Sequence, residues 1–365
     1  MKKLALGLMS GTSADGLSIA AITVKPFKVV AYGTFDYTPE MQKEILSARD
    51  MKAPALSLLN FRLGVFYAAC VEKFCRKNKI PCSAISVIGS HGQTVCHYPE
   101  DKPGHTLQIG EASFIAEKTG VPVVCDFRPR DMAAGGEGAP LIPFMDDYLF
   151  GGGSPVLLQN IGGIGNVAVV GRDVKTLGFD TGPGNCLMDT AVQNYSGGKM
   201  KFDTDGKLAA RGKADMKLVE KFLSAPFFAR RPPKSLDRDT FSAAFLKKHW
   251  RGIGAENIAD VVATLNRFTA ESIALSVKRF VPAKYACREM IVSGGGALNP
   301  VLMKNLSGLL PFAVSPSSAH GMHELAKEPA CFALLAALAL EGKNNHCPAA
   351  TGARHNAVLG KIIPA

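Results

Sequence analysis

Three short turns of the chain combine small residues with side chains that can take part in chemistry. The first, SGTSADG at 10–16, offers backbone N–H groups, hydroxyls and the carboxylate of Asp15. Backbone amides without bulky side chains can converge on a phosphate, and a single carboxylate can hold a magnesium ion directly or through water. This turn therefore predicts a phosphate site with a cation beside it.

The other two turns lie in the second half of the chain. In GFDTGPGN at 178–185, Asp180 ends a predicted strand and Asn185 is placed to cap the helix that follows. A carboxylate in such a position can orient and deprotonate an attacking hydroxyl or water. In VSGGGALNP at 292–300, consecutive glycines let a flat ring lie on the backbone, and Pro300 suits a first helical turn. We interpret this third turn as a nucleoside wall.

Each turn alone is weak evidence, because glycine is the default residue of any tight connection. The P-loop pattern and the dinucleotide-binding glycine pattern are both absent from the sequence. Three such turns in one chain nevertheless favour a nucleotide site more strongly than any one of them does.

The elements that must position these turns read as alternating strands and helices. Apolar runs flank a small-residue turn at 3–24 and again at 156–170, which predicts two hairpins and two related domains with a ligand cleft between them. The polar, proline-bearing stretch 205–242 is expected to be an excursion on the surface of the second domain. Further predicted strands are 84–95, 121–131 and 289–294, predicted helices are 54–78, 110–120, 258–281 and one after Pro300, and helices are expected to close the chain.

Composition narrows the classes of protein that remain. The chain has 365 residues, 47% hydrophobic and 20% charged, as in a globular protein of one or two domains. Its net charge of +11 favours anionic partners, but the basic runs do not alternate with aromatic residues, so we expect no nucleic acid. The nine cysteines form no C-x-x-C pair, and no standard zinc spacing occurs. The apolar runs are too short or too interrupted for a signal or membrane span, so we expect a cytoplasmic protein without a membrane partner.

Taken together, the motifs resemble the anhydro-N-acetylmuramic acid kinase family. The resemblance extends from residue 4 to residue 363 through GLMSGTSADG, GSHGQTVCHYP, DFRPRDMAAGGEGAP, NIGGIGNV, GFDTGPGNCLMD, VSGGGALNP and AVLGKIIP. It implies an α/β fold of two related actin-like (ribonuclease H-like) domains with an interdomain nucleotide cleft. We expect the first domain at 1–145, completed by 345–365, and the second at 146–344.

The resemblance also implies an activity in peptidoglycan recycling. Such an enzyme uses ATP and Mg²⁺ to hydrolyse the 1,6-anhydro bridge of 1,6-anhydro-N-acetylmuramic acid and to phosphorylate O6, and it is expected to be a homodimer. Asp180 would be the general base, and Asp15 would lie nearest the metal. The ATP-binding residues would be Gly11, Thr12, Ser13, Asp15, Gly16, Gly163, Gly182, Gly294, Gly295, Gly296 and Asn299, and the sugar would face His91, Gln93, Arg128, Arg130 and Glu328.

Several alternatives remain open. Glu328 could simply begin a helix, Asp131 could pair with Arg130, and 133–140 could be a plain loop or a segment that moves. The chain departs from the family pattern at Ser18, at Asp237 and at Asp146. The alternatives for the whole protein are a kinase for another anhydro-sugar such as levoglucosan, a non-sugar actin-like ATPase switch, and a degenerate relative that binds without turnover.

Overall fold

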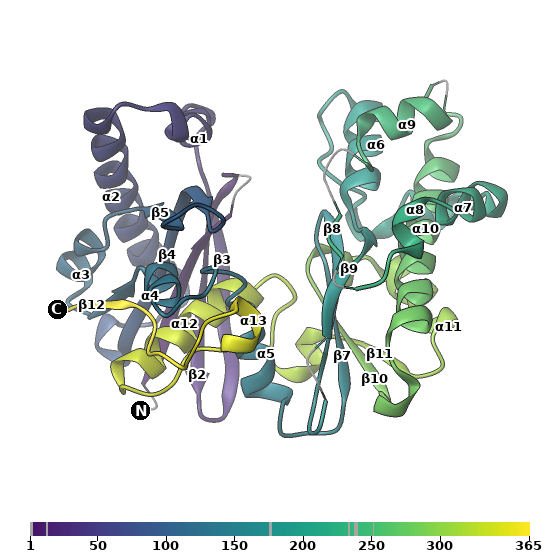
Figure 1. Ribbon diagram of the computed structural model, residues 1–365. Coiled ribbons are helices and arrows are strands. Elements are labelled where there is room, and N and C mark those ends of the chain that lie inside the picture. Colours follow the sequence, from purple (N-terminus) through teal and green to yellow (C-terminus); the bar gives the residue numbers. More distant parts are fainter. Residues whose placement is uncertain (1–2, 12–13, 175–176, 233, 237–239, 251) are drawn as a thin grey trace. The chain divides into compact units, whose positions relative to one another are not determined.

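The computed structural model of the chain divides into two compact units. It describes residues 3–11, 14–174, 177–232, 234–236, 240–250 and 252–365. Unit 1 comprises 1–146 and 321–365, and unit 2 comprises 147–320. Each unit is built on its own β-sheet (Figure 1).

The sheet of unit 1 begins with the predicted hairpin. β1 (Leu4–Ser10), β2 (Gly16–Val24) and β3 (Phe27–Asp36) form an antiparallel meander. On the other side of β1 lie two parallel strands, β4 (Ile85–Tyr98) and β6 (Val123–Cys125), and then β12 (Lys361–Ile363), which is antiparallel to β6. β5 (His105–Ile109) pairs with β4. The last three-residue strand of the chain therefore completes the N-terminal sheet.

The sheet of unit 2 repeats this order. β7 (Val156–Ile161), β8 (Ile164–Val170) and β9 (Leu177–Pro183) form an antiparallel meander, and β10 (Glu289–Ser293) and β11 (Ala313–Pro316) follow β7 in parallel. Both sheets thus share one order: the third, second, first and fourth strands, followed by a further parallel strand. This order is β3-β2-β1-β4-β6 in unit 1 and β9-β8-β7-β10-β11 in unit 2. The prediction of an α/β fold with two related actin-like domains is confirmed by this repeated topology.

The longest apolar helix near the C-terminus belongs to unit 1. α12 (Lys327–Leu340) packs on β1, β2 and β4, and Figure 1 shows it with the N-terminal strands. The approach is close: a Cβ on Gly89 would lie 2.1 Å from the carbonyl oxygen of Phe332, and one on Gly7 would also collide with the helix backbone. Glycines at these two strand positions let the helix lie directly on the sheet. The segment 321–344 therefore packs with unit 1, and not with the second domain as expected from the sequence.

The polar stretch 205–242 is not a surface excursion, so that expectation was wrong. α7 (Met216–Leu223) and α8 (Pro226–Ala229) bury Val219, Phe222, Phe227 and Phe228 in a core shared with the long helix α10 (Ile258–Phe280). These apolar residues alternate with lysines and arginines in the sequence, and this pattern led to the prediction of an exposed stretch. Its aromatic side chains are instead part of the centre of unit 2.

Two further expectations differ locally from the structure. The predicted strand 121–131 stops at Cys125, and α4 (Phe127–Ala133) follows. The chain also closes on a strand and not on helices, since β12 follows α13 (Pro348–Thr351). The remaining α-helices are α1 (Pro39–Leu46), α2 (Ala53–Lys77), α3 (Ser113–Thr119), α5 (Ile142–Phe150), α6 (Cys186–Ser196), α9 (Ala243–His249) and α11 (Pro300–Leu309).

Among the described residues, α2 alone is long and apolar enough to cross a membrane. It buries one side, including Leu59, Leu63, Tyr67 and Phe74, in the hydrophobic core of unit 1. This packing is that of a core helix in a globular unit.

Candidate functional site

The parallel pairing of β1 with β4 brings Ser10 beside Gln93. The Ser10 hydroxyl donates to Oε1 of Gln93 at 2.5 Å, and Nε2 of Gln93 donates to the carbonyl oxygen of Gly11 at 3.2 Å. Both side chains are buried. Gln93, predicted to face the sugar, therefore also holds the start of the glycine-rich turn.

His91 lies two residues earlier on β4 and is buried against Phe332, with ring centroids 4.7 Å apart. Its Nδ1 lies 2.8 Å from the carbonyl oxygen of Gly92, which can only accept, so the ring hydrogen is on Nδ1. Nε2 then accepts from Nε of Arg128 at 2.9 Å. Burial and the charge of Arg128 lower the pKa of His91 to about 3, so the ring is neutral at working pH.

Arg128, on α4, connects the predicted sugar residues. Its Nη1 donates to the carbonyl oxygen of Gly138 at 3.2 Å, and Glu328 at the start of α12 interacts with its charge. Burial raises the pKa of Glu328, while Arg128 and Lys327 lower it. The structure thus groups His91, Arg128 and Glu328. Arg130 is exposed and, at ~100° per helical residue, points well away from Arg128, so it is not part of this group.

Two of the departures from the family pattern adjoin this group. The Ser18 hydroxyl lies 3.4 Å from the Tyr32 hydroxyl, and the pKa of Tyr32 is raised by burial and by Glu328. Nζ of Lys327 lies 2.9 Å from Oδ1 of Asp146, and both side chains are mostly buried. The acid at position 146 is therefore neutralised by the residue before Glu328. Asp237 lies outside the described residues.

The first glycine-rich turn joins β1 to β2 and is only partly described. The N–H of Ala14 donates to the carbonyl oxygen of Gly11 at 3.0 Å, and the exposed carboxylate of Asp15 accepts from Nε2 of Gln42 at 3.0 Å. A Cβ on Gly16 would lie 2.5 Å from the carbonyl oxygen of Phe35, so close strand pairing already requires glycine there. The predicted phosphate ligands Thr12 and Ser13 lie outside the described residues.

In unit 2, Asp180 is held by a strap of chain, residues 234–236. Asp180 lies within β9, and not at its end as expected; its N–H donates to the carbonyl oxygen of Lys234 at 3.1 Å. Its Oδ2 accepts from the N–H of Leu236 at 2.8 Å. Burial raises the pKa of Asp180, while the Leu236 hydrogen bond and the charge of Lys234 lower it. A half-buried carboxylate fixed by the backbone suits a general base.

Lys234 was not predicted from the sequence as a site residue. Its Nζ lies 4.4 Å from the ring centroid of Phe227 and 4.6 Å from that of Phe280, and Phe179 is the third ring beside it. Burial, Arg230 and Arg279 lower its pKa to about 8, against the opposing charge of Asp180. Lys234 ends the basic run ARRPPK at 229–234, within the polar stretch that was interpreted as surface, so no pattern in the sequence distinguished it.

The glycine-rich turns of unit 2 lie together. The N–H of Gly184 donates to the carbonyl oxygen of Gly163 at 2.9 Å, and a Cβ on Gly295 would lie 3.3 Å from Nδ2 of Asn185. Close packing also requires some of these glycines: a Cβ on Gly294 or Gly296 would collide with Ile161, and one on Gly182 would lie 2.9 Å from the Ser272 hydroxyl. The predicted nucleotide residues of unit 2 therefore share one region.

Asn185 and Asn299 both precede helices, but only Asn299 caps its helix with its side chain. Asn185 precedes α6 but donates to the carbonyl oxygen of Ile161 at 3.2 Å and makes no side-chain cap. Asn299, predicted to contact the nucleotide, caps α11 by accepting from the N–H groups of Val301 and Leu302. Its cap is formed without any ligand, so helix formation alone accounts for an asparagine there.

Two units of one strand order, each opening with a hairpin, define an actin-like α/β protein. The family model described as anhydro-N-acetylmuramic acid kinase matches residues 3–365. A relative of that name from Caldanaerobacter subterraneus is 39% identical over 99% of this chain and 97% of its own length, and one from Xanthomonas oryzae is 41% identical over the same shares. The chain belongs to the anhydro-N-acetylmuramic acid kinase family, and it is an enzyme.

Solved structures resemble the chain more distantly. One is a ROK family glucokinase from Streptomyces griseus in complex with glucose and AMPPNP, with a TM-score of 0.37, 12% identity and coverage of 92% of this chain and 99% of that one. Another is component A of the (R)-2-hydroxyglutaryl-CoA dehydratase of Acidaminococcus fermentans, with a TM-score of 0.44, 10% identity and coverage of 92% and 97%.

Proposed function

We propose that this protein hydrolyses the 1,6-anhydro bridge of 1,6-anhydro-N-acetylmuramic acid and phosphorylates O6 of the same sugar. The products are N-acetylmuramic acid 6-phosphate and ADP, and the reaction belongs to peptidoglycan recycling in the cytoplasm. Family membership over nearly the whole chain supports the activity. We also propose the residue roles that follow.

The observation that carries the choice of sugar is the position of Arg128. Its guanidinium is held by His91 and Gly138 through two of its nitrogens, Nε and Nη1. Arginine binds carboxylates through its planar set of N–H donors, and the lactyl group of this sugar carries a carboxylate. Levoglucosan has no carboxylate, so the partly buried Arg128 would stabilise bound levoglucosan less.

Asp180 acts as the general base in this proposal. It takes a proton from water while the water oxygen bonds to C1 and the C1–O6 bond breaks. O6 then bonds to the γ-phosphorus of ATP, the bond to the β,γ-bridging oxygen breaks, and ADP leaves. The backbone strap at Lys234–Leu236 keeps the Asp180 carboxylate in place during these steps. Glu328 and His91 position the sugar, with His91 neutral.

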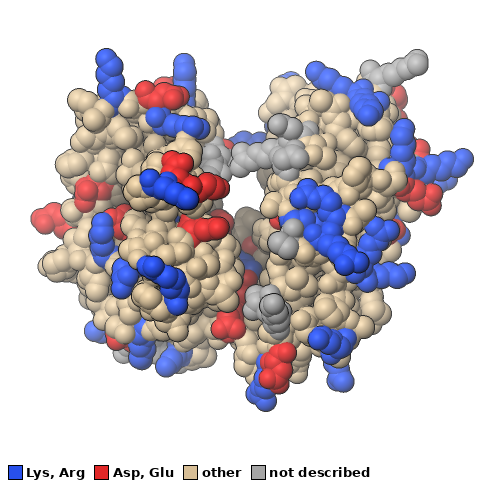
Figure 2. Space-filling view, viewed as in Figure 1, with Lys and Arg blue, Asp and Glu red and all other residues tan. Residues whose placement is uncertain are grey.

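The phosphates of ATP are assigned to the turn at Gly11–Gly16 and to the glycine turns of unit 2. Among the described residues no three metal-ligating side chains cluster, which does not fit a cation cage made by the protein alone. The exposed carboxylate of Asp15 does fit Mg²⁺, which binds one or two carboxylates together with substrate phosphates and water. Bound Mg²⁺ would supply charge neutralisation for phosphoryl transfer. Among the charged side chains that Figure 2 shows on the visible face of unit 2, most are Lys or Arg, and their charge would attract the anionic nucleotide.

One assay separates the candidate functions. The protein is incubated with ATP, Mg²⁺ and either 1,6-anhydro-N-acetylmuramic acid or levoglucosan, and ADP release and sugar mass are followed. A gain of one phosphate and one water by the first sugar supports the proposal. Phosphorylation of levoglucosan alone would indicate a kinase for that other anhydro-sugar. ADP release that does not depend on either sugar would indicate an ATPase switch. Binding of the substrates without turnover would indicate a degenerate relative. A homodimer is part of the proposal and is checked by light scattering.

A further inference from the structure

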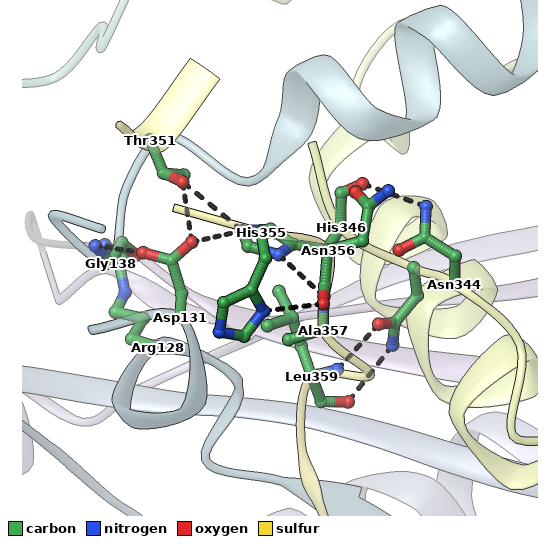
Figure 3. A network of polar contacts seen from close by, with 11 residues as sticks. Arg128, Asp131, Gly138, Asn344, His346, Thr351, His355, Asn356, Ala357 and Leu359 are labelled. Carbon is green, nitrogen blue, oxygen red and sulfur yellow. Dashed lines mark hydrogen bonds and ion pairs between the residues drawn. The ribbon is translucent and has the colours of Figure 1, made fainter. Parts of the chain in front are cut away.

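A buried polar network joins the C-terminal segment to α4 in unit 1 (Figure 3). Its centre is the fully buried carboxylate of Asp131. Oδ1 contacts Nε2 of His346 and accepts from the Thr351 hydroxyl at 2.6 Å, and Oδ2 accepts from the N–H of Gly138 at 2.6 Å. Asp131 is therefore not the partner of Arg130, which was one of the interpretations left open by the sequence.

The hydrogen bonds of His346 with Ala357 and Asp131 have a defined direction. Nδ1 of His346 accepts from the backbone N–H of Ala357 at 3.2 Å, so the ring hydrogen is on Nε2 and points to Asp131. The Asp131 carboxylate thus receives three donors: an imidazole N–H, a hydroxyl and a backbone N–H. A buried carboxylate needs such donors, because loss of one leaves desolvated charge uncompensated.

Gly138 carries the network to the proposed sugar site. Its N–H is held by Asp131, and its carbonyl oxygen accepts from Nη1 of Arg128, whose Nε donates to His91. Gly138 has φ +76°, and a Cβ there would lie 3.0 Å from Met132 and 3.3 Å from His97. The conformation that lets one peptide contact both Asp131 and Arg128 is thus one that favours glycine.

The loop that contains Gly138 is also tied to the C-terminal segment by its backbone. The N–H of Glu137 donates to the carbonyl oxygen of Thr351 at 2.8 Å, and the N–H of Arg354 donates to that of Ala134 at 3.0 Å. We propose that Thr351 and His346 are positioning residues for sugar binding, acting through Asp131 and Gly138 on the Arg128 guanidinium. This inference rests on the proposed function, because it takes Arg128 as the group that binds the lactyl carboxylate.

The test compares two substitutions at one position in the full-length enzyme. Thr351→Val removes one donor to Asp131 at nearly constant volume, and Thr351→Ser keeps the hydroxyl. We expect Thr351→Val to raise the KM for 1,6-anhydro-N-acetylmuramic acid about fivefold, because only part of the free energy lost with one hydrogen bond to a charged group reaches sugar binding. The KM for ATP should not change, kcat should change by less than about twofold, and Thr351→Ser should restore the sugar KM.

Asn345 provides the matched control for stability. It is buried in the same segment, and its amide donates to the carbonyl oxygens of Leu335 and Leu359. Within the described part of the chain it makes no hydrogen bond to Asp131. Asn345→Ala should lower the unfolding midpoint and leave the sugar KM unchanged in the folded fraction. If Asn345→Ala raises the sugar KM as much as Thr351→Val does, the effect is general loosening and the inference is overturned.

A double-mutant cycle with Arg128→Lys separates this inference from the proposed function. If Arg128 binds the sugar, Arg128→Lys alone raises the sugar KM; no change would contradict the proposed function. If Thr351 acts through Arg128, Thr351→Val adds little in the Arg128→Lys background. If Arg128→Lys raises the sugar KM as expected and the effects of the two substitutions are fully additive, the positioning role is overturned and the proposed function stays intact.

Discussion

Oδ2 of Asp180 and the backbone N–H of Leu236 are joined by a hydrogen bond of 2.8 Å, although 56 residues separate them in the chain. The same strap accepts from the N–H of Asp180 through the carbonyl oxygen of Lys234. The carboxylate is therefore oriented from the main chain, which no single side-chain change removes. Its charge, in contrast, depends on side chains nearby.

Asp180→Asn should lower kcat by at least about 100-fold, because the amide cannot accept a proton from water. ATP binding, measured by calorimetry, should be retained, since the strap still has an oxygen to bond. Asp173→Asn, at an exposed turn of the same unit, is the control and should be neutral. A near-normal rate for Asp180→Asn would refute the role of base.

Lys234→Met should move the acid limb of the pH profile of kcat/KM upward by about 0.5 to 1 unit. Asp180 must be deprotonated to act, burial raises its pKa, and Lys234 lowers it. Removal of the lysine charge therefore raises the pKa of Asp180, and activity is lost at a higher pH as the pH falls. Lys304→Met removes the same charge from an exposed site on α11 and should leave the limb in place.

His91 should remain neutral from pH 5 to pH 8 in an NMR titration of the folded protein, with its hydrogen on Nδ1. Its pKa is lowered to about 3, whereas an unfolded chain binds the proton near pH 6.5. The unfolded state thus takes up the proton first, and the free energy of unfolding falls as pH drops from about 6.5 towards 3. His91→Asn should lessen this acid sensitivity; an imidazole shift near pH 6.5 would contradict the assignment.

Gly296→Ala should destabilise unit 2 by about 1 to 3 kcal/mol in urea unfolding. The new methyl group would lie 2.3 Å from Cγ2 of Ile161, which is fully buried, so the turn or β7 must shift. Gly308→Ala is the matched control: nothing lies within 4 Å of its Cβ position on α11, and it should be neutral or stabilising by up to about 1 kcal/mol. Equal effects of the two would contradict the packing argument.

Local patterns were sufficient for much of the fold. The hairpins at β1–β2 and β7–β8 and the long helix α10 are visible in the sequence as regularly spaced apolar residues bounded by turn residues. Both are short-range signals. The place of α12 was not predictable in the same way. Apolar residues on all sides of a helix indicate burial but do not identify the sheet that buries it, and the two glycines that receive it lie far away in β1 and β4.

The site residues also differ in whether short-range patterns in the sequence could identify them. Residues within motifs, such as His91 and Gln93 on β4, could be named from the sequence, and the structure groups His91 with Arg128 and Glu328. Lys234 could not be identified from the sequence, because only the tertiary fold brings Phe179, Phe227 and Phe280 together around it. The sequence also gave no means to separate Arg128 from Arg130, whereas their spacing on a short helix turns them to different sides.

The division of unit 1 into 1–146 and 321–365 has a consequence for biosynthesis. Unit 2 is one continuous segment, so all of its strands are synthesised before α12. β1 and β4 emerge first but wait for the helix that covers them and for β12 at the edge of their sheet. Domains usually fold in the order of synthesis, whereas here the second unit can be complete first. Newly made chains truncated near residue 320 should therefore expose the face of the N-terminal sheet that α12 covers, and they should require chaperones to prevent aggregation.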